Sequence, residues 1–260
     1  MARKTRPESG SHVHDGHRHA DGGEHHHVAD GHRHVHGGEH HHGHDRHRNP
    51  TDLARYLARL EAADRAEWQV PDRVVKALRL QPGDTVCDIG VGPGYFALRM
   101  ARAVGDRGTV YAIDVEPRML AVLRERMLAA GTANVRPLLA TGARGALPPR
   151  RCDLVLVVNT FHHFPDGSAY LRRLAGRLAP GGRIANIDFH KRELPVGPPP
   201  EHKVDRDEFL AVARRAGLEL AKEHHFLRHQ YFLELVPAAP ARKPVRGPRR
   251  RPAGPPHRDF

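Results

Sequence analysis

Short apolar runs alternate along the middle of the chain with stretches whose apolar residues recur three and four positions apart. The first pattern is typical of buried strands and the second of amphipathic helices. The runs predict strands at residues 85–89, 108–114, 134–139, 153–158 and 183–189, and two more strands joined by a turn within 218–236. The helical spacing predicts helices at 96–104, 116–130, 170–178 and 205–216, the third ending before Pro180-Gly181-Gly182. Continuous apolar strands alternating with helices predict an α/β fold, a doubly wound Rossmann-like sheet that is mostly parallel and covered on both faces.

Composition divides the chain into three parts. Residues 1–50 hold 15 of the 23 histidines and almost nothing that could be buried, and residues 237–260 are rich in proline and arginine without any periodicity. Ordering either segment would cost backbone entropy without apolar burial in return, so both are predicted to be disordered tails. Residues 51–236 remain as one folded domain.

Charge and cysteine content narrow the class of protein. The net charge of +12 comes mainly from arginine, and together with the abundant Ala, Gly and Pro it is explained as readily by a GC-rich genome as by an anionic partner. Two cysteines exclude a disulfide-rich scaffold and a metal site made of cysteine alone. The chain has neither an apolar run of membrane-spanning length nor an apolar leader, so we expect a cytoplasmic protein without a membrane span.

A glycine-rich turn lies between the first predicted strand and the first predicted helix. Gly90, Gly92 and Gly94 allow the backbone to approach a ligand there, and the following helix offers unpaired amides, which favours a nucleotide-like ligand. The acidic Asp88 just before the turn would repel a pyrophosphate but suits a cationic ligand such as S-adenosylmethionine. Asp114 ends the next strand, where its carboxylate can accept hydrogen bonds from ribose hydroxyls.

Four segments in order resemble the motifs of class I S-adenosylmethionine-dependent methyltransferases: VCDIGVGPGYF, AIDVEPRML, DLVLVVNTFHHF and LAPGGRIANIDF. The resemblance covers residues 65–236 and implies a seven-stranded sheet in the order 3-2-1-4-5-7-6 with the last strand antiparallel. It also implies a set of cofactor-binding residues on the strand ends: Asp88, Gly90, Gly92, Gly94, Asp114, Val115 and Asn159. The sequence departs from the family at residues 140–146, where an acid that meets the adenine amino group is often found and here is absent.

Other residues near the expected site have functional and structural interpretations side by side. His162 follows the fourth strand and is our candidate catalytic base, although a histidine there can also serve packing alone. Trp68 and Gln69 lie on an expected lid helix at about residues 52–76 and could cover the cofactor, although a tryptophan there can equally belong to a core or an interface. The lid helix, the loop at His162 and the loop at 195–200 would together shape the acceptor site.

The histidine-rich tail contains a tandem repeat, DGHRHADGGEHHH followed by DGHRHVHGGEHHH. Imidazole and carboxylate groups suit divalent Ni, Zn, Cu or Co, but such repeats also expand by replication slippage, so a use for metal stays open. The candidate metal ligands are the histidines of the two repeat units: His17, His19, His25, His26, His27, His32, His34, His40, His41 and His42.

Three functions follow from these observations. The first is a methyltransferase that acts on a small molecule and makes only non-specific contacts with nucleic acid through its basic tail. The second is a protein or RNA methyltransferase anchored by that tail, although Asn159-Thr160-Phe161-His162 lacks the Asn/Asp-Pro-Pro-Tyr pattern of base methylation. The third is a metal-buffering protein whose methyltransferase-like domain is inactive. The oligomeric state is left open.

Overall fold

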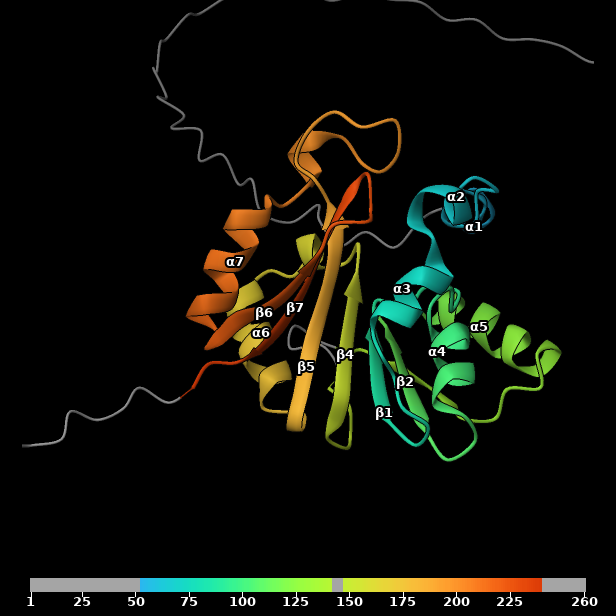
Figure 1. Ribbon diagram of the computed structural model, residues 1–260. Coiled ribbons are helices and arrows are strands. Elements are labelled where there is room, and N and C mark those ends of the chain that lie inside the picture. The colour runs from blue at the N-terminus through green and yellow to red at the C-terminus, as the bar shows by residue number, and fades with distance from the viewer. Residues whose placement is uncertain (1–51, 142–146, 240–260) are drawn as a thin grey trace, which may run out of the picture. The chain divides into compact units, whose positions relative to one another are not determined.

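A computed structural model describes residues 52–141 and 147–239. These residues form one seven-stranded sheet with helices on both faces (Figure 1). The strands are β1 (Thr85–Ile89), β2 (Thr109–Asp114), β3 (Val135–Leu139), β4 (Cys152–Val158), β5 (Leu178–Phe189), β6 (Leu218–His224) and β7 (Gln230–Pro237). The α-helices are α1 (Leu53–Leu60), α2 (Arg65–Gln69), α3 (Pro71–Ala77), α4 (Ala97–Val104), α5 (Pro117–Ala129), α6 (Gly167–Ala175) and α7 (Arg206–Arg215). Two short 3-10 helices, η1 (Phe161–His163) and η2 (Pro200–His202), follow β4 and β5.

The strand order is β3-β2-β1-β4-β5-β7-β6, as the resemblance implied. Neighbouring strands from β3 to β5 run parallel, and β7 runs antiparallel to both β5 and β6. The carboxyl ends of the parallel strands therefore share one edge of the sheet, and the turns after β1, β2 and β4 meet there.

Alternate residues of each central strand enter two separate apolar cores. Val86 and Leu154 pack into the core covered by α3, α4 and α5, whereas Cys87 and Val155 pack into the core covered by α6 and α7. Because both faces of β1 and β4 are buried, their sequences are mostly apolar and do not alternate, although β1 includes the buried Asp88. The prediction of a doubly wound sheet is confirmed.

The expected single lid helix at 52–76 was wrong in detail, because the chain forms three helices there. Helix α2 ends at Gln69, Val70 has a left-handed φ of 38°, and Pro71 begins α3. A left-handed residue followed by a proline at the first helical position cannot continue a helix, so the chain changes direction at Val70.

The predicted helix through Leu178 was also wrong at its end. Helix α6 ends at Ala175, and Leu178 already belongs to β5, where it pairs with Cys152. The β4–β5 ladder then shifts register, and a Cβ at Gly182 would lie 2.6 Å from the Cys152 carbonyl oxygen. The Pro180-Gly181-Gly182 segment is thus an irregularity inside a strand, since glycine permits this close backbone approach.

The two ends of the chain lie largely outside the described residues. Strand β7 ends at Pro237, one residue past the expected domain limit. The disordered tails at 1–50 and 237–260 therefore stay predictions. Among the helices of the described ranges, not one combines the length and apolar character needed to cross a bilayer.

Candidate functional site

The glycine turn lies directly after β1 and is fixed to the neighbouring strand. The amides of Gly90 and Val91 both donate to the carbonyl of Ile113 in β2, at 2.8 and 3.0 Å. Gly90, Gly92 and Gly94 all have positive φ, at 71°, 54° and 91°. The turn thus needs glycine for its backbone conformation at each of the three positions.

The three glycines have different surroundings. A Cβ at Gly90 would lie 2.3 Å from the Thr160 hydroxyl oxygen, and one at Gly94 would lie 2.5 Å from Leu123 Cδ1. A Cβ at Gly92 would meet only Leu60 Cδ1, at 3.8 Å. Gly90 and Gly94 therefore allow close packing within the domain, whereas Gly92 borders open space that a ligand can use.

Asp114 lies at the end of β2 and reaches across to this turn. Its Oδ2 accepts the amide of Gly92 at 2.7 Å, and its Oδ1 accepts the amide of Glu116 at 2.9 Å. Burial raises the pKa of Asp114, and the backbone amides of Glu116 and Gly92 lower it. Each carboxylate oxygen keeps a second lone pair, so the group can still accept from a ligand.

Two apolar side chains are exposed beside Asp114. Val115, the residue after β2, is 63% exposed, and Leu139 at the end of β3 is 44% exposed. Leu139 is in register with Asp114 in the β2–β3 ladder. Sequence reasoning selected Val115 and missed Leu139, although its place at the end of the adjacent predicted strand was the available signal.

Asp88 is almost fully buried within β1. Burial raises its pKa to about 7, and the negative charge of Asp114 adds to this. The Arg65 guanidinium and the Ala97 backbone amide act in the opposite direction. Asp88 is therefore a carboxyl group that titrates near neutral pH at the base of the turn.

A buried chain of hydrogen bonds joins α2 of the lid to the end of β4. Arg65 Nε donates to Gln69 Oε1 at 2.7 Å, and Gln69 Nε2 donates to Gln230 Oε1 at 3.0 Å. Gln230 Nε2 in turn donates to Asn159 Oδ1 at 2.6 Å. We call Arg65, Gln69, Gln230 and Asn159 the polar relay. It holds α2 over the sheet edge. Sequence reasoning selected two of its members, Gln69 on the expected lid and Asn159 at the cofactor, and missed Arg65 and Gln230.

The lid is attached on its other side through α5. Arg126 of α5 forms an ion pair with Glu61, which follows α1, and donates to the Pro93 carbonyl at 3.3 Å. The same arginine thus contacts both the end of α1 and the glycine turn, which places Leu60 over Gly92.

His162 lies in η1 and pairs with a buried carboxylate. Its Nδ1 is 3.4 Å from Asp188 Oδ2, and Asp188 Oδ1 accepts the amide of Phe189 at 2.8 Å. The Asp188 side chain is 1% exposed, against 14% for His162. A buried carboxylate facing Nδ1 orients the ring and leaves Nε2 as the other functional nitrogen. A cavity of about 370 Å³ between η1, α6 and α7 also borders His162.

Aromatic residues from the lid and from β5 meet near this pair. The rings of Trp68 and Phe189 are 5.6 Å apart, and a Cβ at Gly197 would lie 2.8 Å from the Phe189 ring. Three segments were expected to shape the acceptor site: the lid, the loop at His162, which forms η1, and the loop at 195–200. The structure brings Trp68, His162 and Gly197 to the end of β5.

The comparisons with protein families and with solved structures agree with each other. Residues 86–182 match the model of the methyltransferase domain family. The structure resembles that of an S-adenosylmethionine-dependent methyltransferase from Aquifex aeolicus, with a TM-score of 0.65 and 28% identity over 70% of this chain and 96% of that chain. Residues 86–182 of this chain thus carry a methyltransferase domain, and the fold around them is that of a class I S-adenosylmethionine-dependent methyltransferase.

Two curated relatives extend the comparison of the methyltransferase domain. Over 101 residues the chain is 37% identical to the protein-L-isoaspartate O-methyltransferase of Ignicoccus hospitalis, which covers 39% of this chain and 47% of that protein. Over 121 residues it is 30% identical to the demethylmenaquinone methyltransferase of Listeria monocytogenes, which covers 46% and 51%. The chain thus spans about half the length of these relatives.

Two expected features of the methyltransferase domain lie partly or wholly outside the described residues. The segment after β3 is described at Ala140 and Thr141, neither of them an acid, and again from Leu147. The histidines proposed as metal ligands, His17 to His42, all precede residue 52. Within residues 52–141 and 147–239, His, Cys, Asp and Glu form no group of three that could hold a metal ion.

Proposed function

We propose that this chain binds S-adenosylmethionine at the glycine turn and transfers its methyl group to a small molecule. The observation that carries the proposal is the contact between Asp114 and the Gly92 amide. It places a carboxylate from β2 over the open side of the turn that follows β1. This is the arrangement in which an acid can hold a ribose while the backbone approaches the rest of the ligand.

The residues around Asp114 fit the parts of this cofactor. The free lone pairs of the Asp114 carboxylate would accept the ribose hydroxyls, and the exposed side chains of Val115 and Leu139 would flank the adenine. Asn159, held by Gln230, would border the methionine end together with Gly90 and Gly92. In its ionised form, Asp88 would act from beneath the turn as a negative charge that favours a cationic ligand over a phosphate.

S-adenosylmethionine supplies a methyl group already activated by its sulfonium. The protein then has to align an acceptor and exclude water. The lid serves the second task, because the polar relay and Arg126 hold it across the strand ends.

His162 would remove the proton from the acceptor. With the hydrogen on Nδ1 directed at Asp188, Nε2 has a free lone pair that can take the proton of a hydroxyl group or of an acidic carbon. The acceptor atom would then bond to the methyl carbon as the bond from that carbon to sulfur breaks and the neutral thioether leaves. The imidazolium would be stabilised by the Asp188 carboxylate. A thiolate acceptor would need no base. The presence of a base therefore favours an acceptor that must lose a proton, such as a hydroxyl group or an acidic carbon.

The names of the two relatives do not agree on the acceptor. One names a protein residue, isoaspartate, and the other names demethylmenaquinone. What they share with this chain is therefore the methyltransferase domain. We favour a small acceptor because Trp68 of the lid packs against Phe189, the residue that follows the Asp188 partner of His162, and so covers this end of β5.

The test is transfer of label from methyl-labelled S-adenosylmethionine to a cell extract separated by size. We expect label in the small-molecule fraction, and much less of it with Asp114→Ala at a limiting cofactor concentration. Label in protein or RNA would contradict the small acceptor. It would favour a protein or RNA methyltransferase that is anchored by residues 237–260. Cofactor binding without label in any fraction would favour an inactive domain beside a metal-binding tail.

A further inference from the structure

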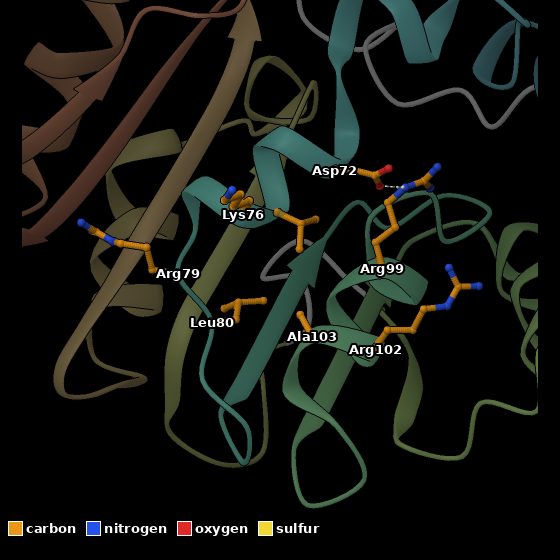
Figure 2. A pocket seen from close by; sticks show the side chains of 8 residues that line it. Asp72, Lys76, Arg79, Leu80, Arg99, Arg102 and Ala103 are labelled. Atoms are coloured by element: carbon orange, nitrogen blue, oxygen red, sulfur yellow. Dashed lines mark hydrogen bonds and ion pairs between the residues drawn. The ribbon is translucent and has the colours of Figure 1, made fainter.

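A second cavity lies away from the glycine turn, between α3 and the C-terminal part of α4. It has a volume of about 420 Å³. Figure 2 shows the side chains that line it, which come from α3, from the two residues Arg79 and Leu80 after it, and from α4. We call it the α3–α4 groove, lined by Asp72, Val75, Lys76, Arg79, Leu80, Arg99, Arg102 and Ala103.

The groove carries a surplus of positive charge. Four of its eight lining residues are cationic and only Asp72 is acidic. Asp72 pairs with Arg99 at 3.2 Å, but the Asp72 side chain is 93% exposed, so water screens this pair strongly. A concave surface lined by one sign of charge concentrates the electric potential and attracts ligands of the opposite sign.

Two of the cations have no acidic partner among the residues that the structure describes. Lys76 and Arg102 form no ion pair within 52–141 and 147–239, whereas Arg79 pairs with the buried Glu234 at 3.2 Å. In Figure 2, Arg99 and Arg102 extend from α4 in the same direction, and Arg79 points away to the other side. Lys76 and Arg102 are thus the cations available to a ligand, whereas Arg99 also donates to the Tyr95 carbonyl at 2.6 Å and stacks on the Tyr95 ring.

The remaining lining indicates what kind of anion fits. Guanidinium groups bind phosphate through paired hydrogen bonds, and an ammonium adds a point charge. Val75, Leu80 and Ala103 form an apolar floor, and none of the eight lining residues is aromatic. Proteins that bind single-stranded nucleic acid use aromatic side chains to stack the bases. The lining therefore does not favour single-stranded nucleic acid, whereas the volume of the groove lies in the range of sites that bind small molecules.

We propose that the α3–α4 groove binds a small molecule that carries two or more linked phosphate groups. Lys76 and Arg102 hold the phosphates, Arg99 adds its positive charge beside them, and the apolar floor packs against the rest of the molecule. This site is separate from the methyl-transfer site and does not depend on the function proposed for it.

The test is calorimetric titration of the full chain with inorganic tripolyphosphate. The double variant Lys76→Gln/Arg102→Gln should bind about a hundredfold more weakly than the wild type, because each substitution removes a charged hydrogen-bond donor. The matched control is Arg124→Gln/Arg214→Gln, which removes the same charge from exposed positions on α5 and α7. It should bind as the wild type does.

The outcomes separate a built site from general attraction. Equal loss in both double variants, or no loss in the groove variant, would overturn the proposal. Binding of an oligouridylate that the groove substitutions abolish, with no binding of tripolyphosphate to the wild type, would also overturn it. Thermal unfolding of each variant is measured alongside. A groove variant that unfolds as the wild type does and has lost tripolyphosphate supports the proposal.

Discussion

Asp114 and Gly92 are joined by a 2.7 Å hydrogen bond from the Gly92 amide to the Asp114 carboxylate. The two residues belong to neighbouring strand ends and lie 22 positions apart in the sequence. The bond holds the carboxylate at the opening of the turn before any ligand arrives. Preorganisation of this kind lowers the cost of ordering a binding site.

The first prediction concerns this carboxylate. Asp114→Ala removes the acceptor for both ribose hydroxyls, and each charged hydrogen bond contributes about 1.5 to 3 kcal/mol. We expect the affinity for S-adenosylmethionine, measured by calorimetry, to fall about a hundredfold or more. The matched control is Asp106→Ala in the exposed loop before β2, which should bind normally. Unchanged affinity in Asp114→Ala would remove this residue from the cofactor site.

The second prediction separates the roles of the glycines. Gly92→Ala meets nothing closer than Leu60 at 3.8 Å, so the domain should stay folded, but the new methyl group occupies the open side of the turn. Cofactor binding should be lost. Gly90→Ala would force Thr160 to move, since its Cβ would lie 2.3 Å from the Thr160 hydroxyl, and should lower the unfolding temperature clearly.

Both substitutions also place a side chain at positive φ, which costs roughly 1 kcal/mol by itself. Gly217→Ala measures that cost alone, because its φ is 81° and nothing lies within 4 Å of the added Cβ. If Gly92→Ala unfolds at the temperature of Gly217→Ala and still binds the cofactor, the turn serves the fold and not the ligand.

The strand order could be predicted because the sequence patterns that indicate it lie within short segments of the chain. Each central strand is a short apolar run, and the glycine turn marks the first crossover. The break of the lid at Val70 was partly visible too, since Pro71 is typical of a first helical position. The early start of β5 was not visible, because Leu178 continues the helical spacing of α6 and only the pairing with Cys152 decides its structure.

The site was predicted where motifs are contiguous and missed where contacts are distant. Gln69 and Gln230 are 161 positions apart, and a glutamine in a sequence does not indicate its partner. Asp188 offered a signal that sequence reasoning did not use, since an acid in the apolar run 183–189 must be buried and therefore needs a partner. That partner is His162, 26 positions earlier.

The third prediction concerns His162 as a base. General bases contribute about a hundredfold or more to rate, so His162→Ala should lower kcat by that amount, with the affinity for S-adenosylmethionine unchanged. Asp188→Asn should lower kcat less than His162→Ala does, because the imidazole of His162 is still present and only its orientation is disturbed. The matched control is the exposed neighbour His163→Ala, which should keep both values. A kcat that is equally reduced in His163→Ala would indicate a packing role for η1.

The fourth prediction concerns the histidine-rich tail, residues 1–48. The described residues hold no metal-ligand cluster, so we expect deletion of the tail to abolish uptake of Ni(II), Zn(II), Cu(II) and Co(II) and to leave cofactor affinity unchanged. Copper should bind most tightly, and acid near about pH 5 should release the metal as the imidazoles become protonated. Dialysis followed by metal analysis checks this. Stoichiometric metal on the truncated chain would place the site elsewhere.

The last prediction concerns the stability of the domain as a function of pH. Burial and the charge of Asp114 raise the pKa of Asp88 to about 7, so between about pH 4 and pH 7 the folded chain binds more protons at Asp88 than the unfolded chain does. The contribution of this residue to the free energy of unfolding must then fall as the pH rises through that range.

Asp88→Asn removes the titration and keeps an oxygen that can accept the Ala97 amide. Its free energy of unfolding relative to the wild type should rise from about pH 4 to about pH 7, by an amount on the order of a few kcal/mol, and then level off. Urea unfolding without cofactor, at a series of pH values, checks this for the wild type, Asp88→Asn and the exposed control Asp106→Asn. Arg65 keeps its contacts with Gln69, the Leu60 carbonyl and the Tyr95 ring in the variant, so loss of its pairing should not mask the effect. A constant difference between Asp88→Asn and the wild type would mean that Asp88 is ionised throughout, with Arg65 outweighing its burial.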